Sequence, residues 1–266
     1  MKYLNDVSYK DLDYIISNKI PLKSNSCNDF IILSYKNSYE VLVKFLDTDT
    51  KAVVRLGHIR NGNVRDKNAP SVYNIGVVGN KYPVWEGGTR TKEYAHWLGM
   101  LTRCYNEGYQ SRQVTYKGCS VIGSFIYYEQ FYEWCQEQVG YNSNDGKGIS
   151  FHLDKDLLIK GNKVYSEDTC VFLPKEINNV LLTSKSSRGE YPIGVSYDES
   201  LRSYKASLSV HGKLRNVGRY STIDMAFNAY KKAKELYIKE LAEKWKGKID
   251  ERAYEALMNY QVEIAD

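Results

Sequence analysis

The sequence predicts an α+β protein of three modules. Closely spaced β-branched and aromatic runs predict a small N-terminal β-barrel within residues 1–80. Helical stripes followed by a strand, a loop, a second strand and a helix predict a central helical and ββα module at residues 90–183. Alternating runs that lead into a helix predict a C-terminal three-stranded antiparallel sheet plus helices at residues 188–266. A proline and paired glycines in residues 83–88 mark the first linker.

The N-terminal module begins with a short helix at residues 11–18, and a meander of strands follows it. Residues 30–35, 39–45 and 51–56 are rich in β-branched and aromatic side chains and are separated by polar turn residues. Such a series of short strands predicts a small barrel. Barrels of this kind bind nucleic acid or peptides, or only connect other modules, so the function of this one stays open.

Two helices are expected in the central module, at residues 91–106 and 125–139, with a strand at residues 115–121 between them. Large side chains recur along both helices at helical spacing: Tyr94, Trp97, Met100, Leu101 and Cys104, then Tyr128, Phe131, Tyr132 and Cys135. Aromatic stripes of this spacing are more often core than cofactor contacts, so we expect both to be packing surfaces.

The second half of this module carries the chemically suggestive residues. Residues 149–159 form a strand, a turn follows, residues 166–173 form a second strand, and Pro174 opens a helix over residues 175–182. His152 and Asp154 lie two residues apart on the first strand and therefore share one of its faces.

The helix adds Asn178 and Asn179, either of which supplies a neutral oxygen. A carboxylate and an amide oxygen with open water positions suit Mg²⁺ or Mn²⁺. The alternative is a ββα segment of the same shape that has no catalytic role.

The C-terminal module has the clearest sequence signals in the chain. Residues 204–210 alternate between apolar and polar side chains, Gly212 marks a hairpin turn, and a second strand precedes Thr222. Thr222 is the expected N-cap of a helix, with Asp224 in its first turn. The apolar face of that helix comprises Met225, Ala226, Ala229, Tyr230, Ala233 and Tyr237.

The excess positive charge of the chain lies in the same module. Residues 185–247 contain 13 Lys or Arg against 7 Asp or Glu, whereas the formal net charge of the whole chain is +5. A basic sheet of three strands suits the major groove of double-stranded DNA in size and charge. The alternative is a solvated, lysine-rich surface without a partner.

A resemblance supports the first alternative. The segments Ile193-Gly194-Val195 and 217–222, followed by Ala226 and Ala229-Tyr230, resemble the plant Apetala/ethylene-response-factor DNA-binding domain in order and spacing. The resemblance implies that the sheet enters the major groove. The contact residues that it implies are Arg202, Lys205, Lys213, Arg215 and Arg219. Two departures, Pro192-Ile193 before the glycine and Tyr204 in place of tryptophan, leave base specificity open.

The ββα segment resembles an HNH nuclease finger. The resemblance implies that Asp154 and either Asn178 or Asn179 hold a divalent metal, and that Thr169 occupies the position of the structural asparagine. Lys155 falls at the position of the general base, but a charged lysine does not accept a proton. His152 is the nearby residue that is able to take over this role.

The combination of the Trp97–Cys104 helix, the finger and the Apetala-like domain resembles phage-encoded homing-type endonucleases. We therefore expect a protein of the host cytoplasm that binds double-stranded DNA and acts as a metal-dependent HNH-like endonuclease. The alternatives are a catalytically inactive DNA-binding regulator and an interaction protein that blocks a host factor.

Cysteine usage and hydropathy agree with a cytoplasmic location. The five cysteines are scattered singly, at residues 27, 104, 119, 135 and 170, and no export signal or membrane-length apolar run accompanies them. We expect reduced, buried thiols and no membrane partner. The absence of a Cys-x-x-Cys pair argues against a zinc site.

Overall fold

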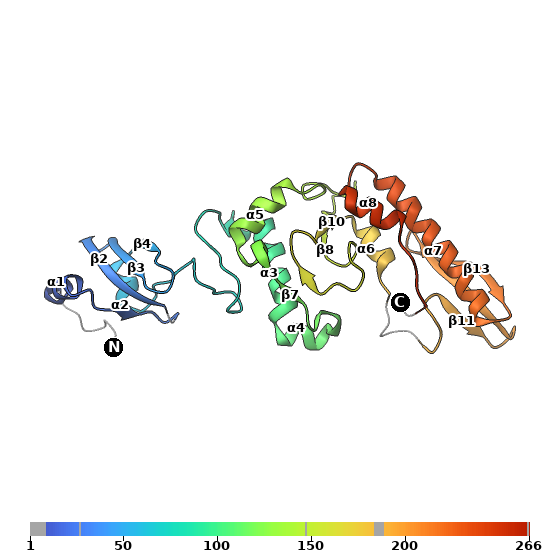
Figure 1. The fold of residues 1–266 in the computed structure, drawn as a ribbon, viewed down its shortest axis with the longest axis horizontal. Helices are drawn as coiled ribbons and strands as arrows, with labels where there is room; N and C mark the ends of the chain where they lie inside the picture. The colour runs from blue at the N-terminus through green and yellow to red at the C-terminus, as the bar shows by residue number, and fades with distance from the viewer. Residues whose placement is uncertain (1–8, 27, 147, 184–188, 265) are drawn as a thin grey trace. The chain divides into compact units, whose positions relative to one another are not determined.

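A computed structural model describes residues 9–26, 28–146, 148–183, 189–264 and 266, and its mixture of helices and sheets confirms the α+β class (Figure 1). The chain divides into two compact units. The first comprises residues 1–109 and 126–131, and the second comprises residues 110–125 and 132–266. The finger and the C-terminal sheet therefore belong to one compact unit. Cys27 lies outside the described residues. The expected boundary at residues 183–188 lies outside them too, except for residue 183.

The first unit opens with a four-stranded antiparallel sheet flanked by two short helices. Its elements are α1 (Tyr9–Ser17), β1 (Leu22–Lys23), β2 (Asp29–Asn37), β3 (Glu40–Phe45), β4 (Lys51–Val54) and α2 (Leu56–Arg60). The strands pair in chain order, from β1 at one edge to β4 at the other, and the described strands do not close. The meander is thus present, whereas a closed barrel is not found. Fully buried Phe30, Ile32, Val41, Val43 and Phe45 form its core with side chains from both helices.

The middle of the chain is mainly helical. Its elements are β5 (Trp85–Glu86), β6 (Thr89–Arg90), α3 (Lys92–Tyr105), α4 (Glu107–Arg112), a 3₁₀ turn at Val114–Tyr116, β7 (Ser120–Val121), a second 3₁₀ turn at Gly123–Ile126 and α5 (Tyr128–Glu137). Trp97, Met100 and Leu101 are completely buried, which confirms that the α3 stripe is core. The strand expected at residues 115–121 is reduced to β7 because a 3₁₀ turn occupies its beginning.

The ββα segment consists of β8 (His152–Asp154), β9 (Val164–Tyr165), β10 (Val171–Leu173) and α6 (Lys175–Leu181). β8 pairs with β10 in antiparallel fashion, and β9 pairs in parallel with β7. The segment is followed by β11 (Val195–Asp198), β12 (Ser203–Val210), β13 (Lys213–Tyr220), α7 (Ile223–Trp245) and α8 (Glu251–Met258).

The three C-terminal strands form the expected antiparallel sheet, in the order β11-β12-β13, and α7 packs against it. The Thr222 hydroxyl accepts a hydrogen bond from the Met225 amide at 3.2 Å, which confirms Thr222 as the N-cap of α7. Ala226 and Tyr230 are buried, but Met225 is 52% exposed and does not belong to the buried face.

Gly194 lies where the sheet meets this helix, and we expect its substitution to be destabilising. Its φ angle is +76°, and an added Cβ would overlap the ring of buried Tyr230. Gly212 has a φ angle of +75° but open space around its Cβ position. Both alanine variants suffer backbone strain, and only Gly194→Ala adds overpacking, which typically costs 1–3 kcal/mol.

Thermal denaturation of the two variants isolates this packing effect. Gly194→Ala should unfold several degrees below Gly212→Ala, since about 1 kcal/mol shifts the midpoint of a domain of this size by 2–4 °C. Equal midpoints would show that Gly194 and Tyr230 do not pack closely.

Candidate metal-binding finger and nucleic-acid interface

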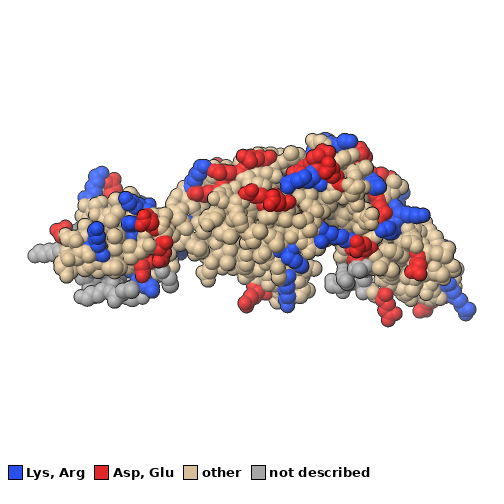
Figure 2. Space-filling model, viewed as in Figure 1, with Lys and Arg blue, Asp and Glu red and all other residues tan. Residues whose placement is uncertain are grey.

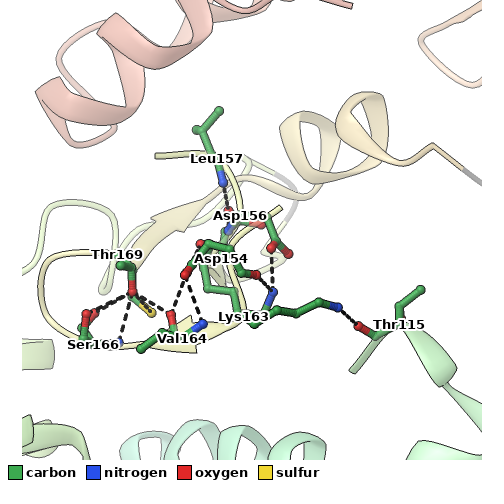
Figure 3. Close-up of polar contacts among 11 residues, drawn as sticks. Thr115, Asp154, Asp156, Leu157, Lys163, Val164, Ser166 and Thr169 are labelled. Atoms are coloured by element: carbon green, nitrogen blue, oxygen red, sulfur yellow. Dashed lines mark hydrogen bonds and ion pairs between the residues drawn. The ribbon is translucent and has the colours of Figure 1, made fainter. Parts of the chain in front are cut away.

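Asp154 ends β8, and its carboxylate organises the loop that follows (Figure 3). Its Oδ1 accepts hydrogen bonds from the backbone amides of Asp156 at 2.9 Å and Leu157 at 2.8 Å. Its Oδ2 has no hydrogen-bond partner among the described residues. Burial raises the pKa of Asp154 and nearby Asp156 adds to the increase, whereas the hydrogen bonds from the Leu157 and Asp156 amides and the charge of Lys155 act against it.

The loop between β8 and β10 is held by Asn162, which the sequence comparison with HNH fingers did not single out. The Asn162 amide nitrogen donates to the carbonyls of Lys155 at 2.8 Å and Val164 at 2.6 Å, and its oxygen accepts from the Val164 amide at 3.0 Å. Thr169, expected at the position of the structural asparagine, also binds Val164: its hydroxyl donates to the Val164 carbonyl of β9 at 2.8 Å. An asparagine after a glycine in a short loop was the available signal.

Lys155 is a buried structural cation. Its side chain is only 5% exposed, and its ammonium donates to the Asp156 carboxylate at 2.5 Å and to the Asn162 carbonyl at 2.8 Å. The ammonium also lies 5.6 Å from the centre of the Tyr165 ring. In each of these contacts the ammonium acts as a hydrogen-bond donor or as a cation, and a protonated lysine has no lone pair with which to accept a proton. The arrangement makes Lys155 a poor general base.

His152 begins β8 and lies on the same strand face as Asp154. It is exposed, whereas Asp154 is half-buried, so the imidazole is accessible to solvent at the edge of the finger. It is not packed in the core. Within the described part of the chain, no group of three or more His, Cys, Asp and Glu side chains is arranged to hold a metal ion.

The two candidate asparagines of α6 have different surroundings. The Oδ1 atom of Asn178 is buried and has no hydrogen-bond partner among the described residues, and α6 packs against β8. Asn179 is exposed and lines a cavity of about 470 Å³, together with His211 and Tyr237. A buried carbonyl oxygen without a partner is costly, so Asn178 is the better candidate for an oxygen ligand.

The segment after α8 packs on the finger loop. Lys160 donates to the Gln261 carbonyl at 3.2 Å, forms an ion pair with Asp266 at 2.6 Å, and lies 5.5 Å from the centre of the Tyr260 ring. Burial raises the pKa of Tyr260 to about 12, and the charges of Asp266, Glu263 and Asp154 add to the increase.

The finger is also joined to the long helix α7. Glu176 in the first turn of α6 accepts hydrogen bonds from Lys244 and from the indole nitrogen of Trp245. The Trp245 ring meets Phe151 edge-on, with 5.3 Å between the ring centres. Because α7 also supports the sheet, one helix connects the finger to the candidate DNA-binding surface.

The sheet has one covered face and one uncovered face. Ala206 and Leu208 of β12 are buried on the side of α7. Lys205, Ser207 and Ser209 alternate to the opposite side. We call this opposite side the outer face.

The register with β13 sorts the basic candidates between the two faces. The pairing skips Val217 and opposes Lys205 with Arg219, Leu208 with Arg215, and Val210 with Lys213. Directly opposed residues share a face of a sheet. Arg219 therefore lies on the outer face with Lys205, whereas Arg215 and Lys213 lie on the side of α7, where their side chains are exposed.

The outer face is more polar than basic. Besides Lys205 and Arg219, it carries Ser196, Asp198, Ser203, Ser207, Ser209, Leu214 and Asn216. Leu214 is 73% exposed. Arg219 forms an ion pair with Asp198 at 2.5 Å, and hydrogen bonds from Ser200 and Arg219 lower the pKa of Asp198 to about 2.

Basic and acidic side chains are interspersed on the visible side of the molecule (Figure 2). Arg202 lies in the turn before β12 with a φ angle of +43° and is exposed, so it borders the sheet.

Burial is confirmed for the four described cysteines, and the pKa of Cys170 is raised by burial to about 12.

No protein-family model, curated protein or solved structure matches this chain. Among the described residues, no helix is both long and apolar enough to span a membrane.

Proposed function

We propose that this protein binds double-stranded DNA through the outer face of the β11-β12-β13 sheet. The observation that carries the proposal is the register, which gathers Lys205, Arg219 and Asn216 with several serines on the face that α7 leaves uncovered. Arginine, lysine, asparagine and serine side chains are the groups that hydrogen-bond to base edges and phosphates. The exposed Leu214 adds an apolar contact of the kind that reads a thymine methyl group.

Alanine substitutions on the two faces test this proposal in the full-length protein. Lys205→Ala and Arg219→Ala should each weaken duplex binding by about 1–3 kcal/mol if the side chains reach bases. Lys213→Ala and Arg215→Ala remove the same charges from the other side of β13 and should have smaller effects. Equal losses for all four variants would indicate charge attraction without docking of the outer face.

Salt dependence provides a second measurement on the same variants. Binding by the parent should weaken steeply as salt rises, because contacts to phosphates release counterions. A variant that loses one phosphate contact should reduce the slope of log K against log salt by about 1. A parent chain that does not bind duplex DNA at low salt would overturn the proposed function.

We further propose that the finger is a metal-dependent module that nicks or cuts the bound DNA. The half-buried carboxylate of Asp154, whose pKa is raised by burial, and the buried, unpartnered oxygen of Asn178 support this proposal. Both side chains supply an oxygen ligand, and they come from elements that pack together. Oxygen ligands fit Mg²⁺ or Mn²⁺ better than zinc. A bound ion there would act as a Lewis acid on a phosphate oxygen. His152 would accept the proton of the attacking water, and Lys155 and Asn162 would hold the loop in shape.

A catalytically inactive DNA-binding regulator is the second candidate. It is favoured by the small set of ligand side chains and by the use of Lys155 as a loop brace. A third candidate is an interaction protein that contacts a host factor through the N-terminal sheet. The resemblance to phage homing-type endonucleases favours the nuclease, which would act in the host cytoplasm.

A further inference from the structure

The β5–β6 hairpin in the first unit presents an exposed tryptophan on a fixed support. Trp85 is 56% exposed and lies directly opposite Arg90, whose guanidinium carbon is 5.6 Å from the centre of the indole ring. The other three tryptophans, Trp97, Trp134 and Trp245, are buried. A large aromatic side chain left in water forgoes considerable burial free energy and is typical of binding surfaces.

The base of the hairpin is hydrogen-bonded to buried Thr91 and Tyr128. The Thr91 amide donates to the Val84 carbonyl at 3.2 Å, and the Tyr128 hydroxyl donates to the Pro83 carbonyl at 2.8 Å. Thr91 also caps α3 by accepting from the Tyr94 amide at 3.4 Å. The exposed tryptophan thus projects from an anchored element.

The tip of the hairpin allows close approach of a partner. Gly87 and Gly88 have φ angles of +55° and +81°, as in a two-residue type I′ turn, and an added Cβ would contact nothing at either position. All residues from Trp85 to Arg90 are exposed. A two-stranded ribbon with a glycine tip is narrow enough to enter a groove of DNA.

Charge indicates which kind of partner suits this ribbon. Residues 81–92 include Lys81, Arg90 and Lys92 against a single acidic residue, Glu86. A basic ribbon with an arginine stacked on an aromatic ring matches the phosphates and sugars that line a DNA groove.

We propose that the β5–β6 hairpin is a second DNA-contacting element, which lies in a groove of the duplex with Trp85 and Arg90 against the DNA. This inference rests on the proposed DNA-binding function. It adds a contact in the first unit to the one made by the outer face in the second.

Intrinsic fluorescence of the full-length protein tests the hairpin contact, because Trp85 is the one exposed tryptophan of the four. Quenching by neutral acrylamide should fall when duplex DNA saturates the parent protein, to the level seen with Trp85→Phe. Quenching of Trp85→Phe itself should not change with DNA. Trp85→Ala should weaken duplex binding roughly tenfold, as expected for an aromatic anchor at an interface.

Tyr39 provides a matched control in the same unit. It is 68% exposed, and the guanidinium carbon of Arg55 lies 5.5 Å from the centre of its ring. Tyr39→Ala should leave duplex binding within about twofold, since it removes an arginine-stacked aromatic outside the hairpin. Equal losses for Tyr39→Ala and Trp85→Ala would overturn the special role of the hairpin.

Two further outcomes separate this inference from the proposed function. If the parent binds DNA with the dependence on Lys205 and Arg219 described above, but acrylamide quenching stays unchanged at saturation, the hairpin proposal is wrong and the sheet proposal stands. If the parent does not bind duplex DNA at all, both proposals are wrong.

Discussion

Asp154→Asn is expected to abolish Mg²⁺-dependent nicking of plasmid DNA while leaving DNA binding unchanged. The asparagine oxygen can still accept the hydrogen bonds from the Asp156 and Leu157 amides, so the loop should keep its shape. The negative charge needed to hold a cation is lost. We expect nicking to fall by at least about 10²-fold, comparable to the loss of one main electrostatic group in an active site.

Although Asp154→Asn should lose nicking activity, it should not lose stability. Burial raises the pKa of Asp154 above its ordinary value, so the folded protein binds a proton at this carboxylate more tightly than the unfolded chain does. The ionised carboxylate is therefore destabilising above the unfolded-state pKa, and this effect disappears as the pH falls below that value. At neutral pH, Asp154→Asn should unfold at the same or a higher temperature than the parent.

Asp156→Asn is the matched control for the nicking measurement. Asp156 is exposed, carries the same charge two residues later, and pairs with Lys155. Its variant should retain nicking within about tenfold, since it removes no proposed ligand. Equal activity of Asp154→Asn and the parent would show that the nicking comes from another site or from a contaminant.

The C-terminal sheet was the most predictable part of the fold because its signals are local. Alternation over residues 204–210, a glycine turn and a threonine cap each specify a backbone conformation without help from distant residues. The faces of β13 were not predictable in the same way. The skipped residue at Val217 reverses the alternation, and a bulge is set by pairing with β12.

The finger was predictable in its order of elements but not in its internal contacts. The sequence named Asp154 and the two asparagines of α6 as candidate ligands, yet it could not distinguish Asn178 from Asn179. That distinction depends on the packing of α6 against β8, which buries one amide oxygen. The Gly161-Asn162 pair predicted a turn, but the sequence did not show which backbone groups Asn162 would bind, because those partners depend on how the loop folds.

His152→Ala is expected to lower nicking by about 10²–10⁴-fold without weakening DNA binding, because a general base contributes a factor of this size. His152 is exposed on the same strand face as Asp154, so a water molecule can reach it. His58, an exposed histidine of α2, provides the control, and His58→Ala should nick as the parent does.

The pH profile separates the roles of His152 and Asp154 when it is measured at increasing Mg²⁺. Because the pKa of Asp154 is raised, acid protonates it at a higher pH than an ordinary aspartate, and the protonated carboxyl no longer holds the cation. Excess Mg²⁺ competes with the proton for the carboxylate and should restore the activity lost in this way. Acid also protonates imidazole, which then cannot act as a base, and added cation should not reverse that effect. At saturating Mg²⁺, the parent should therefore still lose nicking activity as the pH falls. The weak residual activity of His152→Ala should not fall over the same pH range. The same acid profile in both proteins would assign the proton acceptor to another group.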